Sequence, residues 1–146
     1  MTGANHVFSE VFLHATWHCL GNQGLLTRET EQYIQCFLNE YCRKEKGVHF
    51  QGVGGTKDHV HLVIQVEPFV LVSEFIGKIK GASSHEANQR FGRASLQWQR
   101  GYGVVSFSKK HLKFVLDYVA NQQEHHAKGS LNEVLERVEP QVEKPR

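Results

Sequence analysis

The sequence predicts an α+β fold in which four antiparallel strands form one sheet. Stretches with apolar residues at every second position, typical of strands, alternate with stretches whose apolar residues recur every three or four positions, typical of helices. Two strand-like stretches are separated only by a short turn containing glycine, which indicates an antiparallel hairpin. The chain has 146 residues, 40% hydrophobic and 22% charged, and this composition fits one globular domain.

The first half of the chain is expected to fold as strand, helix, strand and strand. Residues 6–19 alternate apolar and other side chains and form the first strand. A helix follows, with Thr27 as its N-cap and Gly47 at its end. Residues 48–54 and 59–66 then form the two strands of the hairpin.

The second half is expected to add a helix, a strand and further helices. A helix over residues 70–91 contains two glycines that weaken it and would let a neighbouring backbone or a ligand approach. Residues 96–108 form the fourth strand, and residues 109–128 form a helix that Ser108 caps and Gly129 ends.

The order of these elements is typical of the ferredoxin-like, split-βαβ arrangement (βαββαβ). It predicts a four-stranded antiparallel sheet with helices on one face, followed by the helix over residues 109–128 near the C-terminus. The strand 59–66 would be central. We expect one domain over residues 1–146, with its core at about 6–129 and a short last helix and polar tail at 130–146.

The location of the protein is expected to be cytoplasmic. The first residues, MTGANHVFSE, have no basic segment followed by an apolar run, and no apolar run approaches the roughly 20 residues of a membrane span. The three cysteines, Cys19, Cys36 and Cys42, form no CxxC pair. They therefore indicate core or idle thiols rather than disulfides or a zinc site.

Basic residues are concentrated in one quarter of the chain. Between Lys78 and Lys113 there are eight Lys and Arg residues and a single acid, Glu86, although the net charge of the whole chain is only +2. This asymmetry favours a face that binds a polyanion. A solvated basic helix without a ligand explains it equally well.

Two histidines stand one residue apart in the most apolar strand. Side chains at positions i and i+2 of a strand leave on the same face, so His59 and His61 point the same way. Imidazole is the commonest metal ligand, but a metal site needs at least one more protein group. Without that group, two satisfied histidines remain the alternative interpretation.

The helix over residues 109–128 offers candidates for that group. Beside its apolar stripe runs a second stripe, in which Tyr118 and Gln122 lie one turn apart on the same side. A tyrosine at the border of a core stripe can keep its hydroxyl available. An ordinary amphipathic helix whose tyrosine packs on the core is the alternative.

Together these segments resemble the single-tyrosine HUH transposase family of small bacterial insertion sequences. DHVHLVI resembles the His-hydrophobic-His motif of that family, and YVANQQEHH resembles its catalytic helix. HATWHCLGNQGLLT, KIKGASS and WQRGYGVVSFS resemble its first strand, second helix and fourth strand. The resemblance extends over roughly residues 8–137.

The resemblance implies a complete set of roles. His59, His61 and Gln122 would bind a divalent metal, Mg²⁺ or Mn²⁺, and Tyr118 would be the nucleophile that forms a covalent 5′-phosphotyrosine. The substrate would be single-stranded DNA with subterminal hairpins. The family acts as homodimers in which the tyrosine helix of one subunit can complete the site of the other.

DNA contacts are expected mainly from the basic quarter. Phosphate contacts would come from basic and hydroxyl side chains, namely Lys78, Lys80, Ser83, Arg100, Lys109 and Lys110. Trp98 and Tyr102 could stack on unpaired bases, with core packing as the alternative for Trp98.

Other functions remain open at this point. A metal-dependent phosphodiesterase or nuclease with a water nucleophile would need His59 and His61 but not Tyr118. A ferredoxin-like nucleic-acid-binding module without catalysis would carry pairs of aromatic residues on its sheet strands, where this chain has histidines. A remnant of a mobile element that still binds DNA but no longer moves it is a further alternative.

Overall fold

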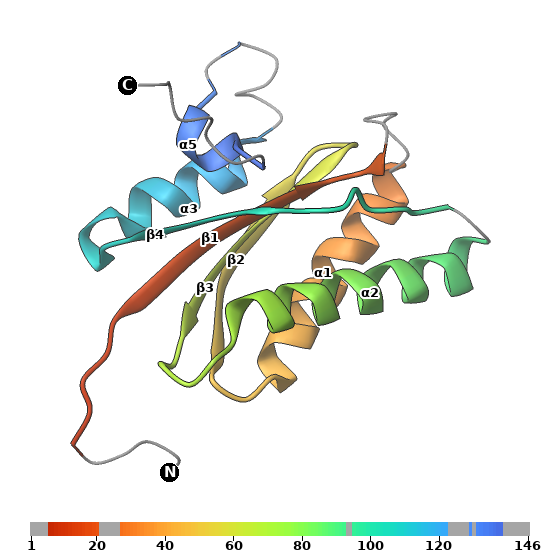
Figure 1. Ribbon diagram of the computed structural model, residues 1–146. Coiled ribbons are helices and arrows are strands. Elements are labelled where there is room, and N and C mark those ends of the chain that lie inside the picture. The colour runs from red at the N-terminus through yellow and green to blue at the C-terminus, as the bar shows by residue number, and fades with distance from the viewer. Residues whose placement is uncertain (1–5, 21–26, 93–94, 123–128, 130, 139–146) are drawn as a thin grey trace, which may run out of the picture.

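The computed structural model describes residues 6–20, 27–92, 95–122, 129 and 131–138. Its sheet contains four antiparallel strands in the spatial order β2-β3-β1-β4 (Figure 1). Their bounds are β1 Val11–His18, β2 Val48–Gly55, β3 His59–Val66 and β4 Gly103–Phe107. The predicted sheet is thus confirmed, and the histidine strand β3 is central.

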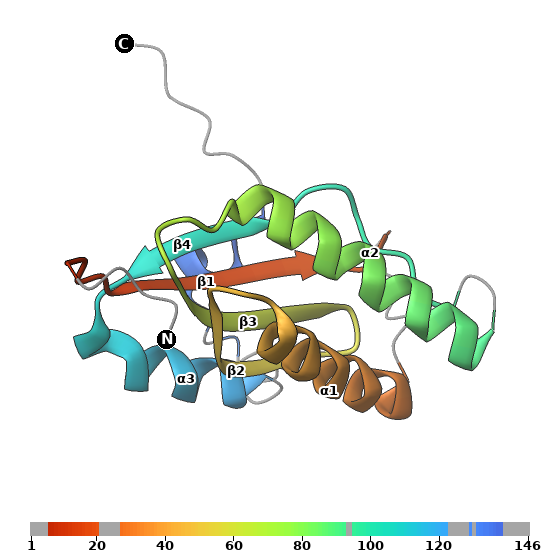
Figure 2. The ribbon, with the colours of Figure 1, turned by 90° about the horizontal axis from the view of Figure 1, so that it is seen from below.

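Two long helices cover one face of this sheet. They are α1, Arg28–Lys44, and α2, Val72–Phe91, which lie in front of the strands in Figure 2. The helix α1 begins where the sequence predicts, because Thr27 Oγ1 accepts a hydrogen bond of 3.1 Å from the Thr30 amide. Among the described residues, no helix is both long enough and apolar enough to cross a membrane.

The main hydrophobic core lies between the sheet and these two helices. Alternate residues of β1 and β3 point into it because successive strand side chains leave on opposite faces. From these two strands the core residues are Leu13, Ala15, Trp17, Val60, Leu62, Ile64 and Val66. The residues that alternate with these in β1 and β3 face the other side of the sheet.

That other side carries the C-terminal elements. A short turn of 3-10 helix, Lys109–His111, leads into α3, Leu112–Ala120, and the last described helix is α5, Glu133–Glu136. Figure 1 shows α3 and α5 across the sheet from α1 and α2. Val115 and Val119 of α3 pack on Val63 of β3 in a small second cluster. The sheet is therefore covered on both faces, and the predicted C-terminal helix lies opposite the other two.

Several predicted boundaries differ from the structure. The fourth strand begins only at Gly103, and before it Trp98 makes an isolated bridge to Cys19. Gly101, with φ of 92°, lies between them in a conformation that favours glycine. The regular helix α3 stops at Ala120, earlier than predicted. The predicted helical segment beyond residue 122 and the tail from residue 139 lie outside the described residues.

The glycines that matter for packing are not the ones that the sequence indicates. A Cβ at Gly77 or Gly81 of α2 would meet nothing within 4 Å, so the expected approach of a neighbouring backbone is wrong, whereas approach of a ligand stays a prediction. A Cβ at Gly54 of β2 would instead overlap the carbonyl oxygen of Val119, and one at Gly103 would overlap that of Arg137. These two glycines let the backbones of the C-terminal segments pack directly on the sheet.

Replacing Gly54 with alanine should therefore destabilise the packing of α3. The added methyl group meets backbone that cannot rotate away, and overpacking of this kind typically costs about 1–3 kcal/mol. The matched control is Gly77→Ala, which should be neutral or stabilise α2 by about 0.5–1 kcal/mol. Urea denaturation followed by circular dichroism measures both. Equal stability of the two variants would contradict this account of Gly54.

Two of the three thiols are buried as predicted. Cys19 and Cys42 are inaccessible, whereas Cys36 is exposed. Burial raises the pKa of Cys19 to about 12, and burial likewise raises that of Cys42 to about 12. Both thiols thus stay protonated and unreactive at neutral pH.

Candidate metal and tyrosine site

The two histidines of β3 lie on the face that α3 covers. His59 and His61 are 1% and 0% exposed, and their ring centroids are 4.9 Å apart. The ring of Tyr118, from α3, lies edge-on to the ring of His61 at 6.2 Å. Gln122, one turn after Tyr118, places its Oε1 3.3 Å from His59 Nε2. The structure thus brings the four residues that the sequence analysis selected into one place within a single chain.

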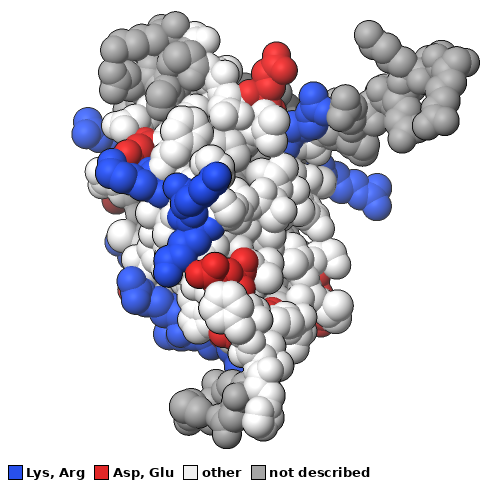
Figure 3. All heavy atoms as spheres, turned by 90° about the vertical axis from the view of Figure 1, so that its left-hand side faces the viewer, with Lys and Arg blue, Asp and Glu red and all other residues white. Residues whose placement is uncertain are grey.

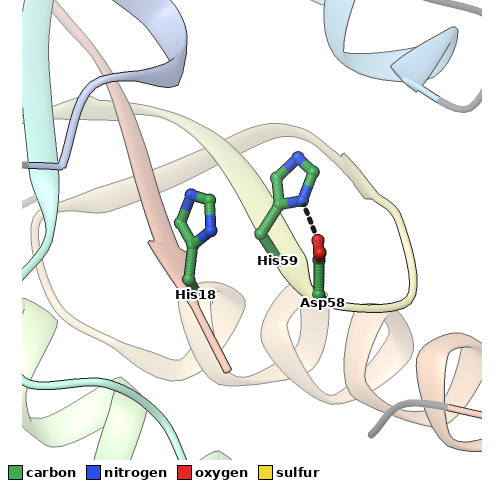
Figure 4. Close-up of side chains that lie close together, drawn as sticks. All are labelled: His18, Asp58 and His59. Atoms are coloured by element: carbon green, nitrogen blue, oxygen red, sulfur yellow. Dashed lines mark hydrogen bonds and ion pairs between the residues drawn. The ribbon is translucent and has the colours of Figure 1, made fainter. Parts of the chain in front are cut away.

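The outer nitrogen of His59 is held by acidic and hydroxyl groups. His59 Nδ1 lies 2.6 Å from Asp58 Oδ1, as Figure 4 shows, and 2.8 Å from Thr56 Oγ1. Burial by itself would raise the pKa of Asp58, but hydrogen bonds from His59 and Thr56 lower it. An ionised Asp58 accepts the Nδ1 proton of His59, and this contact orients the ring so that Nε2 points to the inner side of the site.

The outer nitrogen of His61 has a different partner, His14 of β1. His61 Nδ1 and His14 Nε2 are 2.7 Å apart in the protein interior. Burial, followed by the nearby His61, lowers the pKa of His14 to about 3, so His14 is neutral at pH 7. His14 Nε2 can then accept the Nδ1 proton of His61, and this tautomer again points an Nε2 lone pair inward.

A glutamate from α5 completes the inner side of the site. Glu136 Oε1 lies 3.5 Å from His59 Nε2 and 3.2 Å from His61 Nε2. Among the described residues, His59, His61 and Glu136 form one of two groups whose ligand atoms are close enough to hold a metal ion. The other group is His18, Asp58 and His59, whose side chains Figure 4 shows. Two imidazole nitrogens together with the carboxylate oxygen of Glu136 and the amide oxygen of Gln122 form a set of ligand atoms that fits a divalent cation.

The hydroxyl of Tyr118 is enclosed by the same segment. It donates a hydrogen bond of 2.5 Å to Glu136 Oε2 and accepts one of 2.8 Å from the Asn132 amide. Burial and the adjacent Glu136 carboxylate raise the pKa of Tyr118 to about 12, against the lowering effect of the Asn132 N–H. The side chain is 5% exposed. In this arrangement the phenol is protonated at neutral pH.

The expected DNA contacts divide into two groups. Lys80 Nζ donates to the carbonyl oxygens of Gln99 and Gly101, at 2.8 and 2.7 Å, and so fixes the loop before β4. Ser83 is fully buried and accepts a hydrogen bond from Trp98 Nε1, so the expectation that it meets phosphate is wrong.

The other four basic residues are exposed at the surface. They are Lys78, Arg100, Lys109 and Lys110. On the face drawn in Figure 3, basic side chains outnumber acidic ones. Trp98 packs edge-on against Trp17 at 5.9 Å, and Tyr102 packs against the main core. Core packing is therefore the better interpretation for both aromatic residues.

Among the residues of the site that the sequence analysis missed are two histidines of β1 and a glutamate of α5. His14 and His18 alternate with the apolar stripe of β1, and the antiparallel pairing of β1 with β3 places them beside His61 and His59. Their spacing in HATWH is a signal that could have revealed them. Glu136 offered no such signal, because it is far along the chain in a short helix.

Comparisons with known proteins show which family the chain resembles. The family model described as IS200-like transposase matches residues 7–122. The transposases for insertion sequence element IS200 of Salmonella typhimurium and Salmonella typhi are each 33% identical over 107 residues, covering 69% of this chain and 69% of the relative.

Two solved structures share the fold at low sequence identity. A candidate transposase from Deinococcus radiodurans R1 is 20% identical with a TM-score of 0.65, over 84% of this chain and 98% of that one. A REP-associated tyrosine transposase bound to a REP hairpin is 12% identical with a TM-score of 0.59, over 86% of this chain and 74% of that one. The family match over residues 7–122 and the 33% identity to the IS200 transposases establish that the chain belongs to the IS200-like transposase family.

Proposed function

We propose that this transposase cleaves and rejoins single-stranded DNA at the ends of an insertion sequence through a covalent link to Tyr118. His59, His61 and Gln122 would hold a divalent cation, Mg²⁺ or Mn²⁺. The observation that carries the proposal is the convergence of a tyrosine hydroxyl with two inward-facing imidazoles and an amide oxygen. Neither a water-dependent nuclease nor a binding module explains why the tyrosine belongs to this cluster.

The histidines and the amide define what a cation would do in this site. When bound, a divalent cation withdraws charge from a nonbridging phosphate oxygen and makes phosphorus easier to attack. Asp58 and His14 fix the two rings from behind, so that both Nε2 lone pairs stay directed inward. The Gln122 amide is held by its own hydrogen bond of 3.1 Å from Nε2 to the carbonyl oxygen of Tyr118.

Tyr118 would supply the bond that replaces the one broken in DNA. Its oxygen attacks phosphorus, the bond from phosphorus to the 3′ oxygen breaks, and the phenol loses the proton that the 3′-OH gains. The 5′ phosphate is then covalently attached to the protein. Because a phosphodiester is retained, a second 3′-OH can reverse the step and join strands without ATP.

The substrate, the location and the oligomeric state that we propose follow from the same family membership. We propose that the substrate carries subterminal hairpins, because one structural neighbour is bound to a REP hairpin. The single domain would work in the cytoplasm as a homodimer. The exposed basic residues near the start of α3, Lys109 and Lys110, and those near α2 and β4, Lys78 and Arg100, would contact DNA phosphates.

The polarity of the covalent product tests the proposed chemistry. A hairpin-bearing single strand is labelled either at its 5′ end or at its 3′ end and incubated with the protein and Mn²⁺. The denaturant-resistant adduct should carry only the 3′ label, and the 5′-labelled fragment should be released with a free 3′-OH. Cleavage without any adduct would support a water nucleophile instead, and binding without cleavage would support a module that no longer acts on DNA.

Neutralising two lysines should weaken DNA binding in a salt-dependent way. Each phosphate contact to a single strand contributes about 0.7 to the slope of log K against log salt. The double variant Lys109→Gln and Lys110→Gln should therefore reduce that slope by about 1.4. Fluorescence anisotropy over a salt series measures it, with Lys44→Gln on α1 as the control. An unchanged slope would show that these two lysines do not contact DNA phosphates.

A further inference from the structure

The segment that carries Glu136 lies beyond the part of the chain that the family model matches, which ends at residue 122. The structure nevertheless places this carboxylate at the centre of the site, between the histidines and the tyrosine. Its side chain is 14% exposed. A carboxylate this enclosed requires a specific partner, because burying an isolated charge is costly.

The position of α5 is fixed by several contacts. The Asn132 side chain accepts hydrogen bonds from the Val134 and Leu135 amides, and Leu135 is buried. The Asn132 amide in turn donates to the Tyr118 hydroxyl. Behind the helix, Gly103 of β4 leaves room for the carbonyl oxygen of Arg137. The carboxylate is therefore held in place by the sheet and by α3.

The spacing of the inner donor atoms matches that of ligands around one ion. Neighbouring ligands of an octahedral cation lie about 3 Å apart when each is about 2.1 Å from the ion. Glu136 Oε1 is 3.2 Å from His61 Nε2 and 3.5 Å from His59 Nε2, and Gln122 Oε1 is 3.3 Å from His59 Nε2. Both Nδ1 atoms face away from this point, toward His14 and Asp58, so the two Nε2 atoms and the two Oε1 atoms converge on the inner side of the site.

We propose that Glu136 is the fourth protein ligand of the metal and that the same carboxylate positions Tyr118. Its Oε1 would join the two histidines and Gln122, while its Oε2 holds the phenol beside them. This inference rests on the proposed function, because it assumes the metal that His59 and His61 would bind. A carboxylate adds a negative charge and a hard oxygen to an otherwise neutral set, which strengthens the binding of Mn²⁺ or Mg²⁺.

Direct titration of Mn²⁺ into the full-length protein tests the inference without measuring cleavage. Isothermal titration calorimetry or the electron paramagnetic resonance signal of free Mn²⁺ gives the affinity. Glu136→Gln keeps the shape of the side chain but removes its charge. It should weaken Mn²⁺ binding by at least about 10–100-fold. Losses of this size typically follow from mutating residues that only hydrogen-bond to a metal ligand, and loss of a ligand should cost no less. Glu133→Gln is the matched control, because Glu133 is exposed on the same helix, and it should bind as the unmodified protein does.

A third variant separates this inference from the proposed function. His59→Ala should lose Mn²⁺ binding if the proposed metal site exists. If His59→Ala loses it while Glu136→Gln keeps the original affinity, Glu136 is no ligand and only the present inference is overturned. If all variants bind Mn²⁺ equally, the proposed metal site itself is wrong.

Thermal unfolding without metal shows whether the Glu136 variant is folded. If Glu136→Gln does not fold, Glu136→Asp takes its place, because its shorter side chain withdraws the carboxylate from the two Nε2 atoms. It too should weaken Mn²⁺ binding, and an unchanged affinity would overturn the assignment.

Discussion

Replacing Tyr118 with phenylalanine should abolish the covalent protein–DNA adduct. Phenylalanine keeps the ring that packs edge-on to His61 but lacks the oxygen that would attack phosphorus. The variant also removes a hydrogen-bond partner from Glu136 and from the Asn132 amide, so a stability loss of about 1 kcal/mol is expected. Incubation with labelled hairpin DNA and Mn²⁺, followed by a denaturing gel, shows whether any protein remains attached.

The control for this experiment is Tyr33→Phe. Tyr33 contacts Phe91 and Arg90 through its ring, on the opposite side of the sheet, so loss of its hydroxyl should leave adduct formation unchanged. A Tyr118→Phe protein that still forms the adduct would show that another group is the nucleophile. One that still cleaves without an adduct would identify a water-dependent nuclease.

Removing either of the two histidines proposed to hold the metal should reduce cleavage on the order of a thousandfold. Charge stabilisation by a bound metal is worth several kcal/mol in the transition state, and each 1.4 kcal/mol corresponds to about a factor of ten in rate. His59→Ala and His61→Ala each remove one of the two imidazoles that face Glu136. Single-turnover cleavage rates at fixed Mn²⁺ concentration measure the effect, and chelation by EDTA should produce a comparable loss in the unmodified protein.

The control for the histidines is His49→Ala. His49 is an exposed histidine of β2 that pairs with Glu67, far along the sheet from the site, and its loss should leave the rate unchanged. If both His59→Ala and His61→Ala cleave at the full rate, or if the unmodified protein does so in EDTA, cleavage does not depend on a metal and the proposed mechanism is wrong.

The sequence was sufficient for the parts of the site that depend on local periodicity. The alternation in β3 places His59 and His61 on one face whatever the tertiary structure. Helical spacing likewise places Tyr118 and Gln122 one turn apart. The order of the elements also predicts the sheet, because few topologies accommodate this succession of strands and helices.

The parts that the sequence did not predict depend on contacts between distant segments. His14 meets His61 only through the pairing of β1 with β3, and Glu136 meets both histidines of β3 only because α5 packs on the sheet. Periodicity also cannot tell which face of the sheet α3 covers. Similarly, no local pattern indicated that the Lys80 ammonium group donates hydrogen bonds to the carbonyl oxygens of Gln99 and Gly101.

The two faces of the sheet are packed to very different extents. The side that holds α1 and α2 contains the main core, whereas α3 rests on a small cluster of Val63, Val115 and Val119. If binding of DNA at Tyr118, as proposed, shifts α3, the main core on the opposite face of the sheet therefore stays intact. The fold thus draws most of its stability from one face of the sheet and carries the proposed site on the other, where a local rearrangement would not unfold the protein.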